Sequence, residues 1–441
     1  MSKLAVEHVF KVFGRRQKEG VRRLEAGATR EDLREGGTTA AVIDASFEVE
    51  PGEIFVVMGL SGSGKSTLLR MLNGLLEPTS GRVLFDGQDL TSLAPKALRD
   101  LRSRRISMVF QHFALFPHRS VLANAGYGLE VQGVPRAERE RRATRALELV
   151  GLADWARSWP DELSGGMQQR VGLARALATD ADVLLMDESF SALDPLIRRD
   201  MQDQLIELQH ELRKTVVFIT HDLNEAMRLG DRIAVMRDGR IVQTGTAQEI
   251  LTAPADDYVA GFVQDVDRSR VLTAASIMKD PLVTVPATCD AAAARQAIST
   301  EQDAHAAFVV GPHGELVGAV TEEQVSADGD GGRGVRDLVD TGAQELVTTP
   351  ADAPLAGLLA DAARTTLPLA VVDEAGRLTG VISTGTLLAA LGEDHGRPDA
   401  VAHAARDAER ATSAGDAART TSAVTAAPDD GAAGRKEAAD A

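Results

Sequence analysis

Cysteine and aromatic residues are scarce in this sequence: its 441 residues include one cysteine, Cys289, two tryptophans and two tyrosines. One cysteine excludes an intrachain disulfide and is typical of a protein from a reducing compartment such as the cytosol. No apolar run approaches the ~20 residues that a membrane-spanning helix requires, and residues 1–14 lack the apolar core of a signal peptide. We therefore expect any role at a membrane to require a partner subunit.

Basic residues are also fewer than acidic residues. The chain has 48 lysines and arginines against 65 aspartates and glutamates, a formal net charge of −17. Because nucleic-acid-binding surfaces are basic, this balance argues against a nucleic-acid partner. The hydrophobic share of 44% and the charged share of 26% are ordinary for a soluble globular protein. The length is enough for roughly two to three domains.

Residues 59–67, GLSGSGKST, match the phosphate-binding pattern G-x-x-x-x-G-K-[ST]. An apolar run, Ile54 to Met58, precedes the motif and a helix-compatible run, Ser66 to Asn73, follows it, as the motif requires. Glycines let successive N–H groups surround phosphate oxygens, and the lysine and serine can reach the phosphates and Mg²⁺. The expected phosphate-binding residues are Gly59, Ser61, Gly62, Ser63, Gly64, Lys65, Ser66 and Thr67. The alternative is a Gly/Ser-rich turn that only ends a strand.

Three further apolar segments are predicted to be buried strands that end in polar residues. They are residues 106–110, followed by Gln111; residues 183–186, followed by Asp187 and Glu188; and residues 216–219, followed by Thr220 and His221. Fully apolar strands that alternate with helices indicate a parallel sheet with both faces covered. In such sheets, ligands bind at the carboxyl ends of the strands. The sequence therefore predicts that these polar residues lie at one edge of a sheet.

These residue types suit phosphoryl transfer, which requires positioning and charge neutralisation more than covalent chemistry. We expect Asp187 to hold Mg²⁺ through water, with Ser66 as a ligand, and Glu188 to polarise the attacking water. Gln111 would bridge Mg²⁺ and that water, and His221 would contact the γ-phosphate. Each residue alone has a structural alternative, since acidic residues often cap strand ends and a lone histidine is more often structural than catalytic. Their joint occurrence with the loop favours the catalytic interpretation.

Ordinary elements are expected around these motifs. Residues 4–13 are predicted to be a strand, and the polar segment 15–39 a surface excursion before a second strand at 42–50. The charge run 136–145 is expected to be the solvated face of a helix. The sequence LSGGMQQR at residues 163–170 opens another helix.

The C-terminal part of the chain carries an internal repeat. Residues 277–285 and 306–320 form one copy of a pattern that returns at residues 338–349 and 367–383. Each copy ends in an apolar strand, a glycine turn and a second strand. Repetition on this scale predicts two copies of one small α+β unit that bury a face against each other. Residues 393–441 have almost no large apolar side chains and are predicted to be a disordered tail.

These motifs together resemble those of the ATP-binding subunits of ABC transporters. The matching elements are the phosphate-binding loop 59–67, the Q-loop VFQ ending at Gln111, the signature LSGGMQQR (163–170), the Walker B segment VLLMDE (183–188), the D-loop SALD (191–194) and the switch His221. The resemblance implies an α/β P-loop NTPase fold with a helical subdomain, and a head-to-tail homodimer with two ATP molecules in its interface. Each ATP would lie between the phosphate-binding loop of one subunit and Ser164, Gly165 and Gly166 of the other. Asp194 of the D-loop is also implied as a nucleotide-binding residue.

Within this superfamily the sequence is similar to the glycine betaine/proline betaine importers. The similarity is carried by residues 53–81, 108–118, 161–178, 189–205 and 221–239. Phe13 lies where these proteins stack an aromatic ring on adenine, and a core aromatic residue is the alternative. We also expect the segment after Gln111, from Phe113 to His118 and on to Tyr127, to form part of the groove that receives a permease helix. The apolar side chains of Phe113, Leu115 and Phe116 motivate this expectation, and core packing is the alternative.

Residues 271–392 resemble a pair of cystathionine-β-synthase-type (CBS) domains, 271–329 and 333–392, which this importer subfamily carries as a regulatory module. Nucleotide sites in such domains often end in [ST]-x-x-D, whose carboxylate holds a ribose. Gln324 and Thr386 stand at the equivalent positions here and lack that carboxylate. The sequence therefore argues against an adenine nucleotide at these two places.

The resemblance predicts an ABC ATP-binding domain at 1–268, the tandem CBS pair and the disordered tail. It implies the ATP-hydrolysing subunit of an importer for glycine betaine, proline betaine or related quaternary amines. This subunit would dock on an integral membrane permease at the cytoplasmic face and work with a substrate-binding protein. An importer for another osmolyte, such as choline or carnitine, is one alternative. A soluble ABC ATPase acting on DNA or ribosomes is another, but it usually has two cassettes, coiled-coil inserts or a basic surface.

Overall fold

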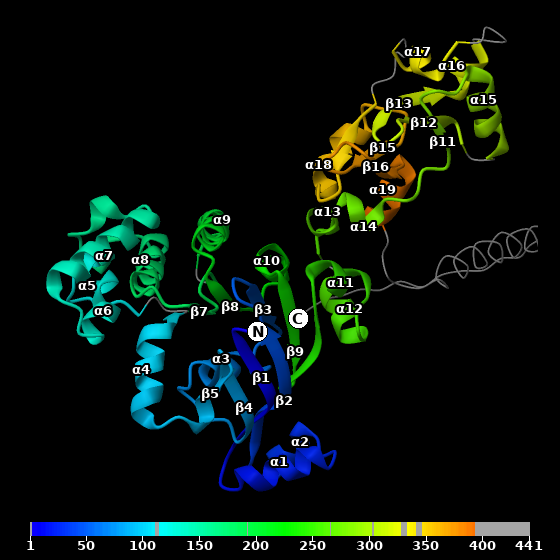
Figure 1. The fold of residues 1–441 in the computed structure, drawn as a ribbon. Helices are drawn as coiled ribbons and strands as arrows, with labels where there is room; N and C mark the ends of the chain where they lie inside the picture. Colours follow the sequence, from blue (N-terminus) through cyan, green and yellow to red (C-terminus); the bar gives the residue numbers. More distant parts are fainter. Residues whose placement is uncertain are drawn as a thin grey trace, which may run out of the picture. The chain divides into compact units, whose positions relative to one another are not determined.

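A computed structural model describes residues 2–110, 114–191, 193–264, 266–301, 304–327, 333–340 and 346–392 (Figure 1). Gln111, Phe113 and the predicted tail 393–441 therefore lie outside the described residues. The N-terminal two thirds of the chain builds two sheets, and the repeated region builds two smaller ones. In the part of the chain that the structure describes, no helix is long and apolar enough to cross a membrane.

The larger sheet has six strands in the order β10-β9-β3-β8-β7-β6. Their bounds are β3 Ile54–Met58, β6 Ile106–Val109, β7 Val183–Asp187, β8 Thr215–Thr220, β9 Arg232–Arg237 and β10 Arg240–Gly245. All neighbours pair in parallel except β10, which forms an antiparallel hairpin with β9 at the edge. Every residue of β3, β7 and β8 is buried, which confirms the predicted sheet with both faces covered.

The first predicted strand does not join that sheet. The strands β1 (Leu4–Phe13), β2 (Thr39–Val49), β4 (Ser80–Phe85) and β5 (Gln88–Asp89) form a second, antiparallel sheet in the order β2-β1-β4-β5. Exposed and buried residues alternate along the second half of β2, as expected where one face of a sheet is open to water. Phe47 stacks on Phe55 of β3 with ring centroids 4.9 Å apart, so the two sheets share a core.

The predicted excursion after β1 contains two short helices, α1 (Gln17–Glu25) and α2 (Arg30–Glu35). Thr29 and Asp32 form a reciprocal capping box that starts α2. Apolar side chains of both helices, including Leu33, are buried in a small cluster with β1 and β2. The segment is therefore a packed unit on the edge of the antiparallel sheet.

The helices between residues 65 and 263 connect and cover the strands. They are α3 (Lys65–Leu72), α4 (Pro95–Arg105), α5 (Val121–Ala125), α6 (Tyr127–Val131), α7 (Arg136–Leu149), α8 (Gly165–Ala178), α9 (Pro195–Leu212), α10 (Leu223–Leu229), α11 (Ala247–Thr252) and α12 (Asp257–Val263). Helices α5 to α8 pack on one another as a helical subdomain. In α7, Ala143, Ala146 and Leu147 are buried, so the charged side chains form its solvated face as predicted. Leu115 and Phe116 are half-buried, and the Phe116 ring lies 4.5 Å from that of Tyr127, which supports core packing for them.

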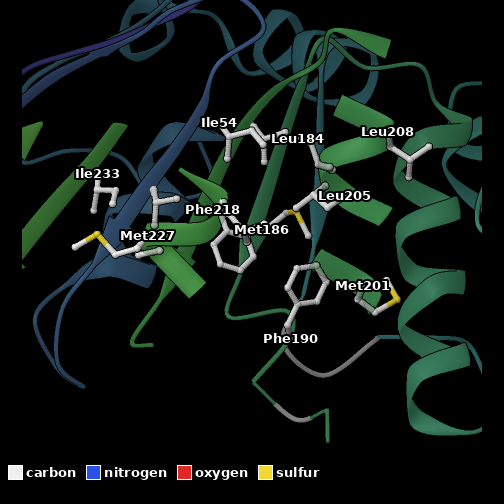
Figure 2. Packing of buried hydrophobic residues seen from close by; sticks show 14 of the residues in the cluster. Ile54, Leu184, Met186, Phe190, Met201, Leu205, Leu208, Phe218, Met227 and Ile233 are labelled. Carbon is white, nitrogen blue, oxygen red and sulfur yellow. The ribbon is translucent and has the colours of Figure 1, made fainter. Parts of the chain in front are cut away.

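The main core lies between the parallel sheet and its helices. Met201, Leu205 and Leu208 recur every three or four residues along α9, so they lie on one face of the helix. Figure 2 shows that this face points toward Met186 of β7 and Phe190, which follows β7 in the chain. The packing fixes α9 directly after the end of β7, where the predicted catalytic residues begin.

The repeated region contains two three-stranded sheets with the same order and pairing. One comprises β11 (Thr284–Pro286), β12 (Ala306–Val310) and β13 (Leu316–Thr321); the other comprises β14 (Thr348–Pro350), β15 (Leu369–Val372) and β16 (Leu378–Ile382). In each, the first pair is parallel and the second antiparallel. The helices of this region are α13 (Arg268–Val271), α14 (Ala274–Ile277), α15 (Ala291–Thr300), α16 (Glu322–Ala327), α17 (Val335–Asp340), α18 (Leu355–Ala362) and α19 (Thr384–Gly392). The structure thus has the internal repeat that the sequence predicts.

Candidate functional site

The phosphate-binding loop connects β3 to α3, with Gly64 as the residue before the helix. Gly59 and Gly64 have φ values of +151° and +108°, and a Cβ at either would lie 2.1 or 2.2 Å from a backbone oxygen. Those oxygens belong to Met236 of β9 and Ala41 of β2. Only glycine fits this backbone conformation and this close approach. The loop is therefore held closely between the two sheets, and this packing is the structural reason for two of its glycines.

Lys65 is buried in the loop, with 4% of its surface exposed. Its Nζ donates to the carbonyl oxygens of Gly59, at 2.8 Å, and Leu60, at 3.1 Å, and lies 3.6 Å from Oε1 of Glu188. Burial lowers the pKa of Lys65, while the charge of Glu188 opposes that shift. A buried ammonium group held among carbonyl oxygens next to helix N–H groups is suited to binding a polyanion.

Asp187, Glu188 and His221 meet the loop at the carboxyl ends of β7 and β8. Ser66 Oγ donates to Oδ1 of Asp187 at 2.9 Å, and Nδ1 of His221 lies 3.1 Å from Oε2 of Glu188. Burial raises the pKa of Asp187, and the hydrogen bond from Ser66 opposes that shift. Glu188 has φ +42°, a left-handed conformation that is uncommon for a non-glycine residue and is concentrated at functional sites. The structure thus brings together five of the predicted site residues, including Lys65.

Glu225 supports the strand end that carries His221, a role that the sequence did not predict. The residue is 4% exposed, and its carboxylate accepts hydrogen bonds from Thr220, the residue before His221, and from Nε2 of Gln202 in α9 at 3.1 Å. Burial is the main cause that raises the pKa of Glu225. A glutamate four residues after a histidine is a common helix residue, so the sequence alone gave no signal for this contact.

Arg198 was also missed, although it joins the D-loop to the segment of the switch histidine. Its Nη2 donates to the carbonyl oxygens of Ser191 and Leu193, and its Nη1 lies 3.3 Å from Oδ2 of Asp222. Asp222 follows His221 directly and caps α10. The guanidinium group therefore links two loops that flank the same edge of the sheet.

The signature segment forms the start of α8. The Ser164 hydroxyl accepts from the Met167 N–H group, and Gly165 and Gly166 are the first residues of the helix. Ser164 and Gly165 are exposed, while a Cβ on Gly166 would lie 2.6 Å from the Ile197 side chain of α9. The helix N-terminus therefore presents backbone N–H groups at an exposed position.

The remaining predicted site residues differ in their exposure and in their contacts. Phe13 ends β1 with 40% of its surface exposed, and the Lys11 ammonium lies 5.3 Å from its ring, so it is not a core aromatic residue. Oδ1 of Asp194 caps α9 by accepting from two backbone N–H groups, which is a structural role beside the predicted one. Thr67 is half-buried in α3. Gln111 lies outside the described residues.

Gln324 and Thr386 both take part in hydrogen bonds at the N-termini of helices in the repeated region. Gln324 Oε1 accepts from the Thr321 N–H group at 2.8 Å, and the Thr386 N–H group donates to Ser383 Oγ at 3.0 Å. Each pair satisfies groups at the first turn of its helix. Of the two positions without a ribose-binding carboxylate, Gln324 therefore accepts a hydrogen bond at its helix start, while at position 386 the capping side chain is that of Ser383.

The loop and its surroundings fit a nucleoside triphosphate with a magnesium ion. Ser63 Oγ is buried and has no hydrogen-bond partner among the described residues, which leaves a polar group for a phosphate oxygen. Ser66 Oγ and Oδ1 of Asp187 are adjacent oxygen ligands of the kind that Mg²⁺ prefers. The described residues contain no cluster of three acidic, histidine or cysteine side chains able to hold a metal. Mg²⁺ does not need one, because it retains waters and shares phosphate oxygens.

Comparison with known proteins gives the same assignment. The family model described as "ABC transporter" matches residues 42–191, and the CBS domain model matches residues 274–327. The chain is 49% identical over 394 residues to the glycine betaine/carnitine transport ATP-binding protein GbuA of Listeria monocytogenes, covering 89% of this chain and 98% of that protein. It is 47% identical over 394 residues to the glycine betaine transport ATP-binding protein OpuAA of Bacillus subtilis, covering 88% and 92%.

A third relative extends this agreement. The glycine betaine/proline betaine transport system ATP-binding protein ProV of Escherichia coli is 45% identical over 393 residues, covering 88% of this chain and 97% of that protein. All three alignments extend beyond the ATPase part into the repeated region, because they cover almost nine tenths of the chain. The chain therefore belongs to the ATP-binding subunits of ABC transporters, which hydrolyse ATP to drive transport, in the branch that contains the glycine betaine transport proteins.

Proposed function

We propose that this subunit powers the uptake of glycine betaine, proline betaine or a related quaternary amine. The observation that carries the proposal is the meeting of Lys65, Ser66, Asp187, Glu188 and His221 at one edge of the parallel sheet, in a chain with the stated relatives. The relatives supply the substrate class, because an ATPase subunit does not itself contact the transported molecule. Carnitine, which the name of the Listeria protein includes, is the second candidate substrate.

Each residue of the site has a role in the proposed hydrolysis. The N–H groups of residues 59–67 and the Lys65 ammonium bind the β- and γ-phosphates. Glu188 accepts a hydrogen bond from the attacking water and orients it toward the γ-phosphorus atom. His221, whose Nδ1 lies 3.1 Å from Glu188, contacts a γ-phosphate oxygen through its other ring nitrogen. Gln111 would complete the water site.

When bound, Mg²⁺ would supply positive charge that offsets the charge of the phosphate groups. Ser66 would hold it through its hydroxyl oxygen, and Asp187 would hold it through water. Ser66 Oγ donates to Oδ1 of Asp187 at 2.9 Å, so the two groups are close enough to take these roles at one ion. Phe13 would stack its exposed ring on adenine.

We propose that the active unit is a head-to-tail homodimer. The backbone N–H groups at the start of α8, where Ser164 and Gly165 are exposed and Gly166 is buried, would complete the γ-phosphate site of the second subunit. Asp194, at the start of α9, would lie at the same interface. In this arrangement each ATP molecule is shared between two chains, so that hydrolysis depends on association.

The proposed partners are an integral membrane permease, through which the subunit is peripheral to the cytoplasmic face of the membrane, and a substrate-binding protein. We propose that the repeated region is a CBS pair that regulates transport. A small effector such as a cyclic dinucleotide, bound between the pairs of two subunits, would need no ribose-binding carboxylate at Gln324 or Thr386.

The test is transport by the whole assembly in vesicles. The subunit would be reconstituted with its permease and its substrate-binding protein, and uptake of radiolabelled glycine betaine, carnitine and choline would be measured with ATP on the side of the ATPase subunit. ATP-dependent uptake of a quaternary amine supports the proposal. ATP hydrolysis that no quaternary amine stimulates would favour a different transported substrate.

A further inference from the structure

The phosphate-binding loop is contacted by side chains from two elements that the proposed chemistry does not use. Arg30 lies in α2, within the segment between β1 and β2, and Tyr258 lies in α12. Both reach the turn formed by residues 60–63, which we call the loop turn. Neither residue belongs to residues 42–191, the segment matched by the ABC transporter model.

The loop turn has little packing of its own. The N–H group of Ser63 donates to the carbonyl oxygen of Leu60 at 3.2 Å, and Gly62 has φ +79°, as the third position of a type II turn requires. Leu60, Ser61 and Gly62 are exposed, and a Cβ at Gly62 would meet no atom within 4 Å. The shape of the turn therefore depends on hydrogen bonds that reach it from elsewhere.

Arg30 provides one of these hydrogen bonds. Its Nη2 donates to the carbonyl oxygen of Gly62 at 3.1 Å, and its Nη1 lies 3.5 Å from Oδ1 of Asp238. Asp238 and Gly239 form the turn between β9 and β10, and the Gly239 N–H group donates to the carbonyl oxygen of Ser63 at 2.9 Å. Arg30, this hairpin turn and the loop turn are thus joined in a closed set of polar contacts.

Tyr258 provides a contact on the preceding residue of the turn. Burial raises the pKa of Tyr258, and the backbone of Leu60, which interacts with the phenol group, opposes that shift. The ring is fixed by the Arg237 guanidinium, 4.7 Å from its centroid, and by the Phe262 ring at 5.7 Å. Arg237 precedes Asp238 in the same hairpin, so the contacts of Tyr258 and Arg30 converge on one side of the loop turn.

We propose that Arg30 and Tyr258 are positioning residues that hold the loop turn in the shape that binds nucleotide phosphate. The carbonyl of Gly62 and the N–H group of Ser63 belong to one planar peptide unit, so a hydrogen bond to the carbonyl fixes the orientation of both. Arg30 also places a positive charge beside a loop that receives a polyanion. The inference rests on the proposed nucleotide site and deepens it, since it assigns a binding role to two elements outside the shared ATPase segment.

The test measures nucleotide affinity on the full-length chain. Mg·ADP binding would be followed by isothermal titration calorimetry, and KM and kcat for ATP would be measured separately. Arg30→Gln removes the hydrogen bond to Gly62, and Tyr258→Phe removes the hydroxyl group that interacts with the backbone of Leu60. We expect each variant to weaken Mg·ADP binding about threefold to tenfold. We expect the increase in KM for ATP to be larger, as a factor, than the decrease in kcat. Arg30→Lys, which keeps a donor and the charge, should recover part of the affinity.

The matched control is Arg34→Gln, because Arg34 is an exposed arginine of the same helix, α2. It should bind Mg·ADP as the wild-type chain does. Wild-type affinity in both test variants would overturn the inference while leaving the proposed function intact. A lowered melting temperature with parallel losses in affinity and kcat, not relieved by Arg30→Lys, would assign these residues a folding role only. A wild-type chain that binds no Mg·ADP would instead refute the proposed nucleotide site itself.

Discussion

The Nδ1 atom of His221 lies 3.1 Å from the Oε2 atom of Glu188, although 33 positions separate the two residues in the chain. The parallel pairing of β7 with β8 creates this contact, because the two residues follow the carboxyl ends of neighbouring strands. Glu188 also lies 3.6 Å from the Lys65 ammonium through its other oxygen. Its carboxylate is thus held between two groups that we propose contact phosphate.

Replacing Glu188 with glutamine should preserve nucleotide binding and slow hydrolysis by about a hundredfold or more, since a general base contributes a factor of this size. The isosteric amide keeps the contacts but cannot accept a proton. The variant should therefore accumulate as an ATP-bound dimer, visible by size-exclusion chromatography with ATP. Glu207→Gln, an exposed glutamate of α9, is the control. Hydrolysis at the wild-type rate by Glu188→Gln would disprove the assignment.

Replacing Arg198 with glutamine should lower kcat about threefold to tenfold and leave Mg·ADP affinity unchanged, because charge-assisted hydrogen bonds to the D-loop are lost without a change in the phosphate loop. The exposed neighbour Arg199 supplies the control variant, Arg199→Gln. Steady-state ATPase assays and calorimetry separate the two quantities. An equal loss of affinity would show that Arg198 acts on nucleotide binding and not on the link between the two loops.

Replacing Phe13 with alanine should weaken nucleotide binding about fivefold or more, because stacking on a base is worth about 1–3 kcal/mol. Phe13→Trp should retain the affinity, since it keeps an aromatic face. Both variants can be compared by calorimetry with Mg·ADP and Mg·GDP. If Phe13→Ala binds Mg·ADP as the wild type does, adenine stacks on another group.

Stability should respond to pH through Glu225. Burial raises its pKa in the folded state, so folding is favoured while the carboxyl is protonated and part of that stability is lost as pH rises through the raised pKa. Glu225→Gln removes this titration. Its melting temperature relative to the wild type should therefore increase as the pH is raised from about 4 to about 8. Glu211→Gln, at an exposed position, is the control: its melting temperature relative to the wild type should not change with pH. If the relative melting temperature of Glu225→Gln is also independent of pH, the prediction is wrong.

Removing the repeated region should change the regulation of transport and leave hydrolysis possible. A chain that ends at Asp267 keeps every strand and helix of the ATPase part, since α13 begins at residue 268. In vesicles with its permease, we expect it to transport with a weaker dependence on salt or added cyclic dinucleotide than the full chain. The same dependence in both chains would mean that the region has a structural role only.

The phosphate-binding loop, the strand-end acidic residues, the internal repeat and the parallel sheet could all be predicted from the sequence. These features are encoded locally: the glycine spacing of residues 59–67 and the unbroken apolar runs of β3, β7 and β8 each specify a conformation without distant information. The antiparallel sheet was not predicted, because strand pairing depends on which segments meet in space and β1 pairs with both β2 and β4.

The contacts that surround the site depend on the folded arrangement of the chain and could not be predicted from the sequence. Arg30 reaches Gly62, Arg198 joins two loops and Glu225 supports Thr220 through hydrogen bonds that depend on side-chain direction after folding. An arginine or glutamate in a helix carries no local mark of such a contact, since most of these residues face solvent. These supporting residues are therefore identified only when segments distant in sequence come close together in the fold. The phosphate-binding loop and the catalytic residues, in contrast, can be identified from short sequence patterns.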